Sequence, residues 1–260
     1  MKLSFYTPIA YDYKYAIASI LSYYKIADEI VLAIDQDRIS WSNKKYEFND
    51  QDFNERINAI DKDKKIKIII GNFHKFQKPI DNDTYERNYI SRNCMIGNYI
   101  IGIDSDEILL NPDEFKIWMN NCNINSDVKS RLFTVYKSFK NYLLNVQPDE
   151  MTVVGTALIS SYNKCRNTRN FTVDSPLQIL HYSWARNETE LLQKLLNWGH
   201  STDFNIKKHY QIWQSVNLQN YRSQTMLHPL GMKNNWTNLN LINLSQYNLS
   251  EELLKEIEEF

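Results

Sequence analysis

The sequence has few glycines and no glycine-rich phosphate-binding loop. Only six of its 260 residues are glycine, and neither Gly-x-Gly-x-x-Gly nor Gly-x-x-x-x-Gly-Lys-Ser/Thr occurs. These absences argue against a Rossmann dinucleotide site and a P-loop. Gly-x-Ser-x-Gly, the nucleophile elbow of an α/β-hydrolase, is missing as well. A phosphorylated ligand would therefore have to be held by side chains and a metal ion.

Cysteine is also scarce, and long apolar runs are missing. Cys94, Cys122 and Cys165 show no Cys-x-x-Cys spacing, which argues against a zinc site or a disulfide framework and suits a reducing compartment. The chain begins in a strand-like stretch without a signal-peptide pattern. No apolar run approaches the roughly 20 residues that cross a bilayer. We expect a cytoplasmic protein without a transmembrane segment, while peripheral membrane contact and the oligomeric state stay open.

Positive and negative charges are nearly balanced. The formal net charge is −1, which argues against nucleic acid as an obligatory partner. The 43% of hydrophobic residues is enough to build a core. A chain of this length is expected to form one large α/β domain, alone or with a small appendage.

Short apolar runs alternate with helical patterns in the first part of the chain. Strand-like runs cover residues 2–8, 29–35, 65–71 and 98–103, and helical spacing covers residues 15–24 and 53–60. A further helix is expected to start at Thr84, as its cap, and to continue to residue 93. This alternation predicts a mainly parallel sheet with helices on both faces.

The pattern changes after Arg131. Residues 132–136, 142–146 and 151–159 look like strands whose connections are too short for helices, so we expect an antiparallel segment. Helical patterns follow at 188–198 and 203–218, and Ser250 is the expected cap of a last helix. We predict a main domain over residues 1–203 and a helical C-terminal extension over residues 204–260, packed on it.

The strand-like run at 98–103 ends in Asp104, Ser105, Asp106 and Glu107. Two carboxylates spaced i, i+2 at a strand end can reach one hard cation. A solvated acidic turn is the alternative interpretation. Ligands bind at the carboxyl ends of strands in open α/β sheets.

His181 follows another strand-like run and could return to the same sheet edge. Two carboxylates and one imidazole suit Mn²⁺, or Mg²⁺ with waters. A lone histidine among apolar neighbours more often has a structural role, so both interpretations stay open.

Taken together, these motifs resemble a known enzyme family. Arg92-Asn93, the stretch from Gly97 to Glu107, and His181-Tyr182-Ser183-Trp184 follow one another in the order typical of family 2-type glycosyltransferases with the GT-A fold. The resemblance covers roughly residues 2–203. It implies a Rossmann-related, GT-A-like fold and a nucleotide-sugar donor, with UDP favoured, held through Mn²⁺ or Mg²⁺. It further implies a glycan or glycoconjugate acceptor and a role in polysaccharide biosynthesis.

The resemblance also implies roles for individual residues. Asp106 and His181 would bind the metal ion, and Asp104 would contact the metal or the ribose. The residues expected to contact the nucleotide sugar are Thr7, Pro8, Asp35, Arg87, Arg92, Asp104 and Ser105.

An inverting transfer also needs a carboxylate that takes the proton of the acceptor hydroxyl. Asp174 is the preferred candidate and Glu150, beside Asp149, is the other. The interpretation of Asp174 as a loop cap before a proline remains, and inversion and retention are both open.

Three other classes remain as alternatives. Haloacid-dehalogenase-like phosphatases also place Asp-x-Asp after an apolar strand, but normally near the N-terminus. Nucleotidyltransferases use paired carboxylates together with a glycine-rich N-terminal loop, which is missing here. A non-catalytic GT-A-like binding module would have kept the fold and lost the transfer activity.

Overall fold

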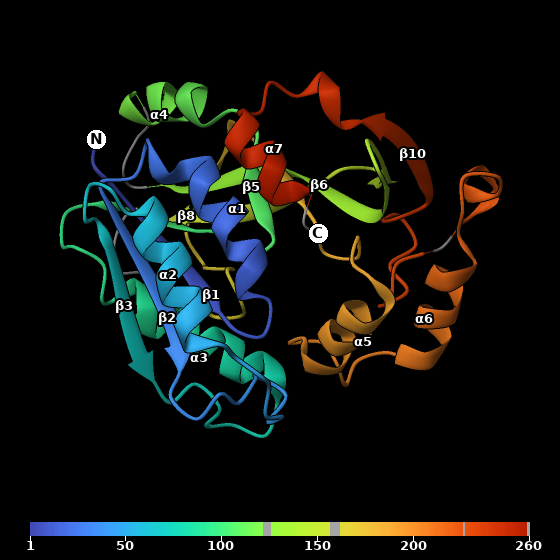
Figure 1. Ribbon diagram of the computed structural model, residues 1–260, viewed down its shortest axis with the longest axis horizontal. Helices are drawn as coiled ribbons and strands as arrows, with labels where there is room; N and C mark the ends of the chain where they lie inside the picture. Colours follow the sequence, from blue (N-terminus) through green and yellow to red (C-terminus); the bar gives the residue numbers. More distant parts are fainter. Residues whose placement is uncertain (122–125, 157–161, 226, 259–260) are drawn as a thin grey trace.

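The computed structural model describes the chain except residues 122–125, 157–161, 226 and 259–260. The described residues contain a ten-stranded sheet with helices packed against it (Figure 1). The elements of the first half are β1 (Leu3–Ile9), α1 (Tyr13–Tyr24), β2 (Glu29–Asp35), α2 (Asp50–Ile60), β3 (Ile66–Gly71), α3 (Pro79–Ser91), β4 (Tyr99–Gly102), β5 (Glu107–Leu109) and α4 (Pro112–Asn120). Those of the second half are β6 (Asp127–Phe139), β7 (Tyr142–Gln147), β8 (Glu150–Thr156), β9 (Thr172–His181), α5 (Glu188–Asn197), α6 (Ile206–Ser215), η1 (Tyr221–Ser223), β10 (Asn238–Asn243), η2 (Leu244–Gln246) and α7 (Glu251–Ile257).

The strands β3, β2, β1 and β4 lie side by side in this order and are parallel. Successive side chains of a strand point to opposite faces. In β1, Phe5 packs in the core that includes α1 and α2, whereas Tyr6 packs on the other face with residues of α3. Because both faces are covered, the inner strands β1, β2 and β4 are apolar almost throughout. The predicted α/β class is confirmed, with a mainly parallel central sheet flanked by helices.

Beyond β4 the sheet continues through β8, β6, β7 and β10, and each of these neighbours is antiparallel to the last. This is the antiparallel segment predicted from the short connections. The strand expected over residues 151–159 corresponds to β8, and the expected residues Ala157, Leu158 and Ile159 lie outside the described residues.

The prediction that Thr84 caps a helix is wrong. Helix α3 begins five residues earlier at Pro79, with Lys78 as the N-terminal flanking residue. Proline suits the first helical position because its missing N–H is not needed there. Thr84 lies inside the helix, and its Oγ1 donates to the Ile80 carbonyl over 2.7 Å, as threonines in helix interiors often do.

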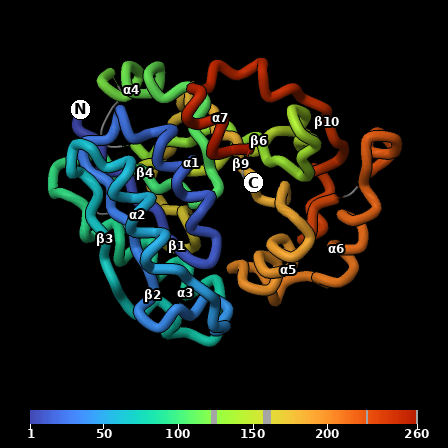
Figure 2. Tube along the Cα trace, in the orientation of Figure 1, coloured from blue at the N-terminus to red at the C-terminus, as the bar shows by residue number. Residues whose placement is uncertain are grey.

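Residues 204–260 contain more than helices. Strand β10 pairs with β7 and so belongs to the sheet. Leu253 and Ile257 of α7 pack against Tyr15 and Ala18 of α1, and Figure 2 shows α7 beside α1. The end of the chain therefore returns to its first helix. No helix within the described ranges is long and apolar enough to cross a membrane.

Strand register brings the acidic motif to the end of β9. Glu107 lies opposite His181 across β5 and β9, and Thr134 lies opposite His181 across β6 and β9. The Tyr182 N–H donates to the Asp106 carbonyl over 2.9 Å. The acidic turn after β4 therefore lies beside the end of β9 and the middle of β6.

Candidate functional site

A cavity of about 610 Å³ lies where the acidic turn meets the end of β9. Its walls come from the loops after β1 and β2, the inner face of α3 and the acidic turn 104–106 on one side. Residues of β6, β8, the end of β9, the end of α5 and the segment 228–236 form the other side. The cavity is therefore shared between the parallel and the antiparallel half of the sheet.

Asp104, the first acid after β4, is held by an arginine of α3. Arg87 donates from Nη1 to Oδ1 over 2.7 Å and from Nη2 to Oδ2 over 3.1 Å. The same guanidinium donates from Nε to Asp83 Oδ1 over 2.5 Å. Burial favours protonation of Asp104, but Arg87 and Arg166 outweigh it and hold the pKa of this carboxyl well below its usual range. Asp104 is thus an ionised group with both oxygens occupied.

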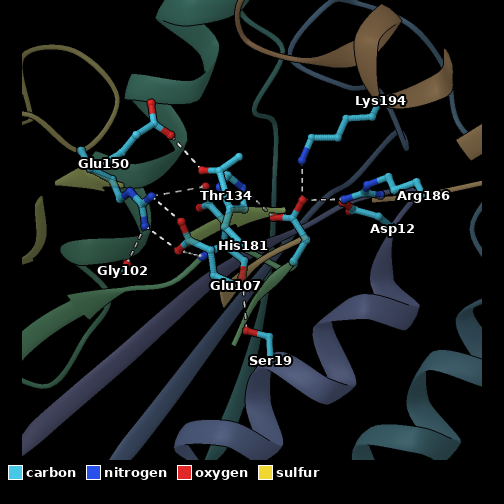
Figure 3. Close-up of polar contacts among 12 residues, drawn as sticks. Asp12, Ser19, Gly102, Glu107, Thr134, Glu150, His181, Arg186 and Lys194 are labelled. Carbon is cyan, nitrogen blue, oxygen red and sulfur yellow. Dashed lines mark hydrogen bonds and ion pairs between the residues drawn. The ribbon is translucent and has the colours of Figure 1, made fainter. Parts of the chain in front are cut away.

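Three basic side chains, Arg186, Lys194 and His181, lie around Asp106, and Figure 3 labels all three. Arg186 Nη2 donates to its Oδ2 over 2.6 Å, Lys194 Nζ donates to the same oxygen, and His181 Nε2 lies 3.5 Å from Oδ1. The Asp106 side chain is only 3% exposed. Burial alone would raise the pKa of Asp106, but Lys194, His181 and Arg186 hold it well below its usual value. Asp106 therefore stays charged inside the protein.

Local sequence explains how Lys194 reaches this buried position. Helix α5 is capped by Asn187, whose side chain accepts from the Glu190 N–H. Leu191 and Leu195 of this helix are buried in an aromatic cluster with residues of β7 and the C-terminal segment. Lys194 lies three residues from Leu191, so the two share one face of the helix. Burial of the leucines carries the ammonium group toward Asp106.

Glu107 fixes the shape of the acidic turn. Its side chain is fully buried and accepts two hydrogen bonds from Arg166, of 2.7 and 2.6 Å. Its Oε2 also accepts the Asp104 N–H over 2.9 Å, and Arg166 Nη1 donates to the Gly102 carbonyl over 3.1 Å. The Glu107–Arg166 ion pair therefore stabilises the conformation of the turn that carries Asp104 and Asp106.

The three predicted metal ligands do not form one cluster. Arg87 occupies both oxygens of Asp104. Asp106 Oδ1 and His181 Nε2 do face each other at 3.5 Å, which is too long for a good hydrogen bond. The other ring nitrogen of His181 is buried without a hydrogen-bond partner in the described ranges. A carboxylate and an imidazole so placed fit a divalent cation whose other ligands come from water and phosphate.

A different set of close acidic and histidine atoms comprises Asp35, Asp37 and His74. Asp35 Oδ1 accepts the backbone N–H groups of Asp37 and Ile39, and its Oδ2 accepts the Phe73 N–H and contacts His74 Nδ1 at 2.8 Å. These bonds close the loop after β2. Asp35 lines the cavity, as expected of a nucleoside contact, but its oxygens already hold the loop.

Two other predicted donor contacts, Pro8 and Ser105, also line the cavity. Thr7 does not line it, because its side chain is buried against α1, where its Oγ1 lies 2.9 Å from Tyr23 Oη. Arg92 is exposed at the C-terminal end of α3 and is not part of the cavity wall.

The two candidate bases lie in different places. Glu150 lines the cavity, and its Oε2 accepts from Thr134 Oγ1 over 2.8 Å. Asp174 is exposed, is not part of the cavity wall and lies opposite Lys129 of β6, five residues before the Thr134 that faces His181. Five strand residues span about 17 Å. The structure therefore does not bring Asp174 to the acidic motif.

Sequence reasoning missed several charged groups of the site. Arg186 comes five residues after His181, and this proximity to a predicted ligand was a usable signal. Arg166 lies outside the helices and strands and carries no periodic signal. Glu86 shares a helix face with Arg87 and Asp83, but a charged residue in a helix normally faces solvent.

No protein-family model and no curated protein matches the sequence. Among solved structures, the chain is similar to residues 1–349 of TarS from S. aureus, with 16% identity, a TM-score of 0.34, and coverage of 52% of this chain and 36% of that one. It is also similar to a 4-diphosphocytidyl-2C-methyl-D-erythritol synthase (10% identity, TM-score 0.30, 59% and 66% covered). A third is a mannose-1-phosphate geranyltransferase from Thermus thermophilus (5% identity, TM-score 0.28, 85% and 67% covered). The chain spans about a third of the TarS fragment, and likenesses this distant leave the function to be argued from the cavity.

Proposed function

We propose that the protein is a glycosyltransferase that moves a sugar from a nucleotide-sugar donor to a hydroxyl of a glycan or glycoconjugate. UDP is the favoured nucleotide, and polysaccharide biosynthesis is the favoured role. The observation that carries the proposal is the shared cavity. Arg87 of α3 and Lys194 of α5 are buried beside the ionised carboxylates of Asp104 and Asp106. On the antiparallel side, Glu150 lines the cavity together with Trp184 and Trp236. The cavity volume of about 610 Å³ falls within the range of small-molecule sites.

The buried cations beside the acidic turn suit a diphosphate. Transfer of the sugar breaks its bond to the β-phosphate, so negative charge grows on the leaving nucleoside diphosphate. Fixed cations at that position stabilise the transition state more than the ground state. Arg87 and Lys194 are buried and already oriented by Asp104 and Asp106, so they need little reorganisation to meet the phosphates.

Asp106 and His181 are the residues that would hold Mn²⁺ or Mg²⁺. When bound, such an ion acts as a Lewis acid for the leaving diphosphate. Because Arg87 occupies both oxygens of Asp104, we assign Asp104 to positioning Arg87 rather than to the metal.

The antiparallel side of the cavity suits the acceptor. In an inverting reaction the acceptor oxygen forms a bond to the anomeric carbon while the bond to the β-phosphate breaks. Glu150 would take the proton of the attacking hydroxyl, and we prefer it to Asp174 because it lines the cavity. Thr134 donates to Oε2 of Glu150 and leaves the other oxygen for the acceptor. Trp184 and Trp236 also line the cavity and offer rings on which a sugar can stack.

The phosphatase alternative receives less support. Its nucleophile is an aspartate that must present a free carboxylate oxygen to phosphorus. Asp104, the first aspartate of the motif, has both oxygens bound by Arg87 and so presents no free oxygen.

A thermal-shift panel of nucleoside diphosphates, each with Mn²⁺ and with a chelator, tests the proposal. Ligands that bind the native state raise the melting temperature, and we expect the largest rise with UDP and Mn²⁺. Asp106→Asn is expected to abolish the shift, whereas Asp174→Asn, exposed and outside the cavity wall, is the matched control that keeps it. Hydrolysis of UDP-sugars without acceptor then reports turnover.

Two results would contradict the proposal. A shift with metal fluorides, and with no nucleotide, would favour the phosphatase. Nucleotide binding without turnover of any donor would favour the binding module.

A further inference from the structure

The part of the cavity next to the ends of β1 and β2 is lined by aromatic rings and a carboxyl group. Tyr11 follows β1, Trp41 and Tyr46 follow β2, and Glu86 lies on the inner face of α3. The Tyr11 and Tyr46 rings meet edge to face at 6.1 Å. Trp41 Nε1 donates to Glu86 Oε2 over 2.5 Å. Such walls accommodate a flat ring and leave polar groups for its edge.

Glu86 differs from the other buried acids of this cavity. Asp83 and Asp104 are paired with Arg87, and Asp106 is paired with Lys194. Glu86 is 5% exposed, and no lysine, arginine or histidine in the described part of the chain lies within ion-pair distance of it. A buried carboxyl without a cation favours its protonated form.

The groups around Glu86 also favour its protonated form. Its pKa is raised to about 8, chiefly by burial, and the charges of Asp83 on α3 and Asp35 at the end of β2 act in the same direction. The Trp41 hydrogen bond and the more distant charge of Arg87 act in the opposite direction without cancelling the rise. At pH 7 the group is therefore mainly a carboxylic acid, which offers one O–H donor as well as acceptor oxygens.

Tyr46 adds a second unused donor. It is 5% exposed, and its hydroxyl is buried without a hydrogen-bond partner among the residues that the structure describes. Burial and the nearby Glu86 keep the pKa of Tyr46 above its ordinary value, so the hydroxyl keeps its proton. A buried polar group without a partner is unfavourable, and a ligand that accepts its hydrogen bond would relieve this.

We propose that Glu86 and Tyr46 read the base edge of the donor nucleotide and select uracil, with Glu86 acting as an uncharged acid. The imide edge of uracil has an N–H between two carbonyl oxygens. It needs two donors and one acceptor, which the hydroxyl of Tyr46 and the acid form of Glu86 supply together. An ionised Glu86 would lack its donor and would repel the carbonyl oxygens. This inference rests on the proposed function, because it assigns the base within that donor site.

The test is UDP affinity by isothermal titration, from pH 6.5 to pH 9.5, for the full chain and three variants. For the unchanged protein, the dissociation constant is expected to rise about tenfold per pH unit above pH 8. Glu86→Ala is expected to bind UDP at least tenfold more weakly at pH 7. Glu86→Gln is expected to recover most of that loss and to remove the added pH dependence, because its amide has a donor and an acceptor but no titration. Tyr46→Phe is expected to weaken binding about threefold to tenfold.

Ionisation of uracil itself changes the UDP affinity of all four proteins equally. The difference in pH dependence between the unchanged protein and Glu86→Gln therefore reports the ionisation of Glu86 alone. The same pH profile in the unchanged protein and in Glu86→Gln would overturn the inference. So would equal affinity for ADP, GDP, CDP and UDP. Both outcomes leave nucleotide binding intact and hence the proposed function standing, whereas absence of any nucleotide binding by the unchanged protein would refute the proposed function itself. Melting temperatures of the free variants show whether a loss reflects misfolding.

Discussion

Replacing Arg87 by methionine tests whether buried cations hold the acidic motif together. The Arg87 side chain is 4% exposed and is paired with both Asp83 and Asp104. Removing one partner of a buried pair leaves an uncompensated charge, which costs about 3–5 kcal/mol. Asp104 is 27% exposed and has Arg166 at 3.9 Å, so we expect the low end, about 3 kcal/mol.

The measurement is the free energy of unfolding in urea at pH 7, with Lys25→Met as the control. Lys25 pairs with Asp113 over 3.0 Å, but both side chains are largely exposed, and such surface pairs contribute about 0–1 kcal/mol. The double variant Arg87→Met/Asp104→Asn should regain part of the loss, because it removes one of the two unpaired charges. A loss of less than about 1 kcal/mol for Arg87→Met would refute the reasoning, since the pair would then behave like a surface pair.

Three further predictions concern pH, packing and catalysis. The pKa of Asp106 is depressed in the folded state. The stabilisation that its charge contributes is therefore complete well above the unfolded pKa of about 3.9 and is lost as the pH falls through 3.9 toward the lower folded pKa. Urea unfolding at pH 7 and pH 3.5 should therefore show a smaller loss of unfolding free energy on acidification for Asp106→Asn than for the unchanged protein. A β-carbon at Gly102 would lie 2.5 Å from the buried Tyr6 ring, so Gly102→Ala should lower the stability by about 1–3 kcal/mol, and an unchanged melting temperature would contradict this packing. Glu150→Gln should lower kcat by about 100-fold or more while donor binding is kept, whereas Asp174→Asn should keep its kcat; the opposite result would restore Asp174 as the base.

The parallel half of the fold could be predicted because its signals are local. Runs such as residues 29–35 are apolar on both faces, and this happens when helices cover both faces of a sheet. The start of α3 also has a local signal, because Pro79 is a favourable first residue. Threonine is a favourable cap residue as well, which is why Thr84 is expected from its type alone to start the helix.

The candidate site could be predicted only in part. Asp104 and Asp106 were recognised because they end an apolar run, and the end of a parallel strand is where ligands bind. Asp174 precedes the strand-like run that ends at His181, which makes it the expected base from sequence order. In the structure this strand extends back through Asp174, so seven strand residues, about 23 Å, separate it from His181. Strand β8, in contrast, begins with Glu150 at the cavity wall.

The sequence by itself determined the alternation of strands and helices, the position of the acidic motif at a strand end and the antiparallel character of the second half. These follow from backbone periodicity and from connection length, which act over a few residues. Only the tertiary structure decided which charges meet. Lys194 reaches Asp106 from 88 residues away, and Arg166 reaches Glu107 from 59. Local sequence patterns do not predict such contacts. A buried cation is stabilised by the carboxylate that it neutralises, and that carboxylate is often distant in the sequence.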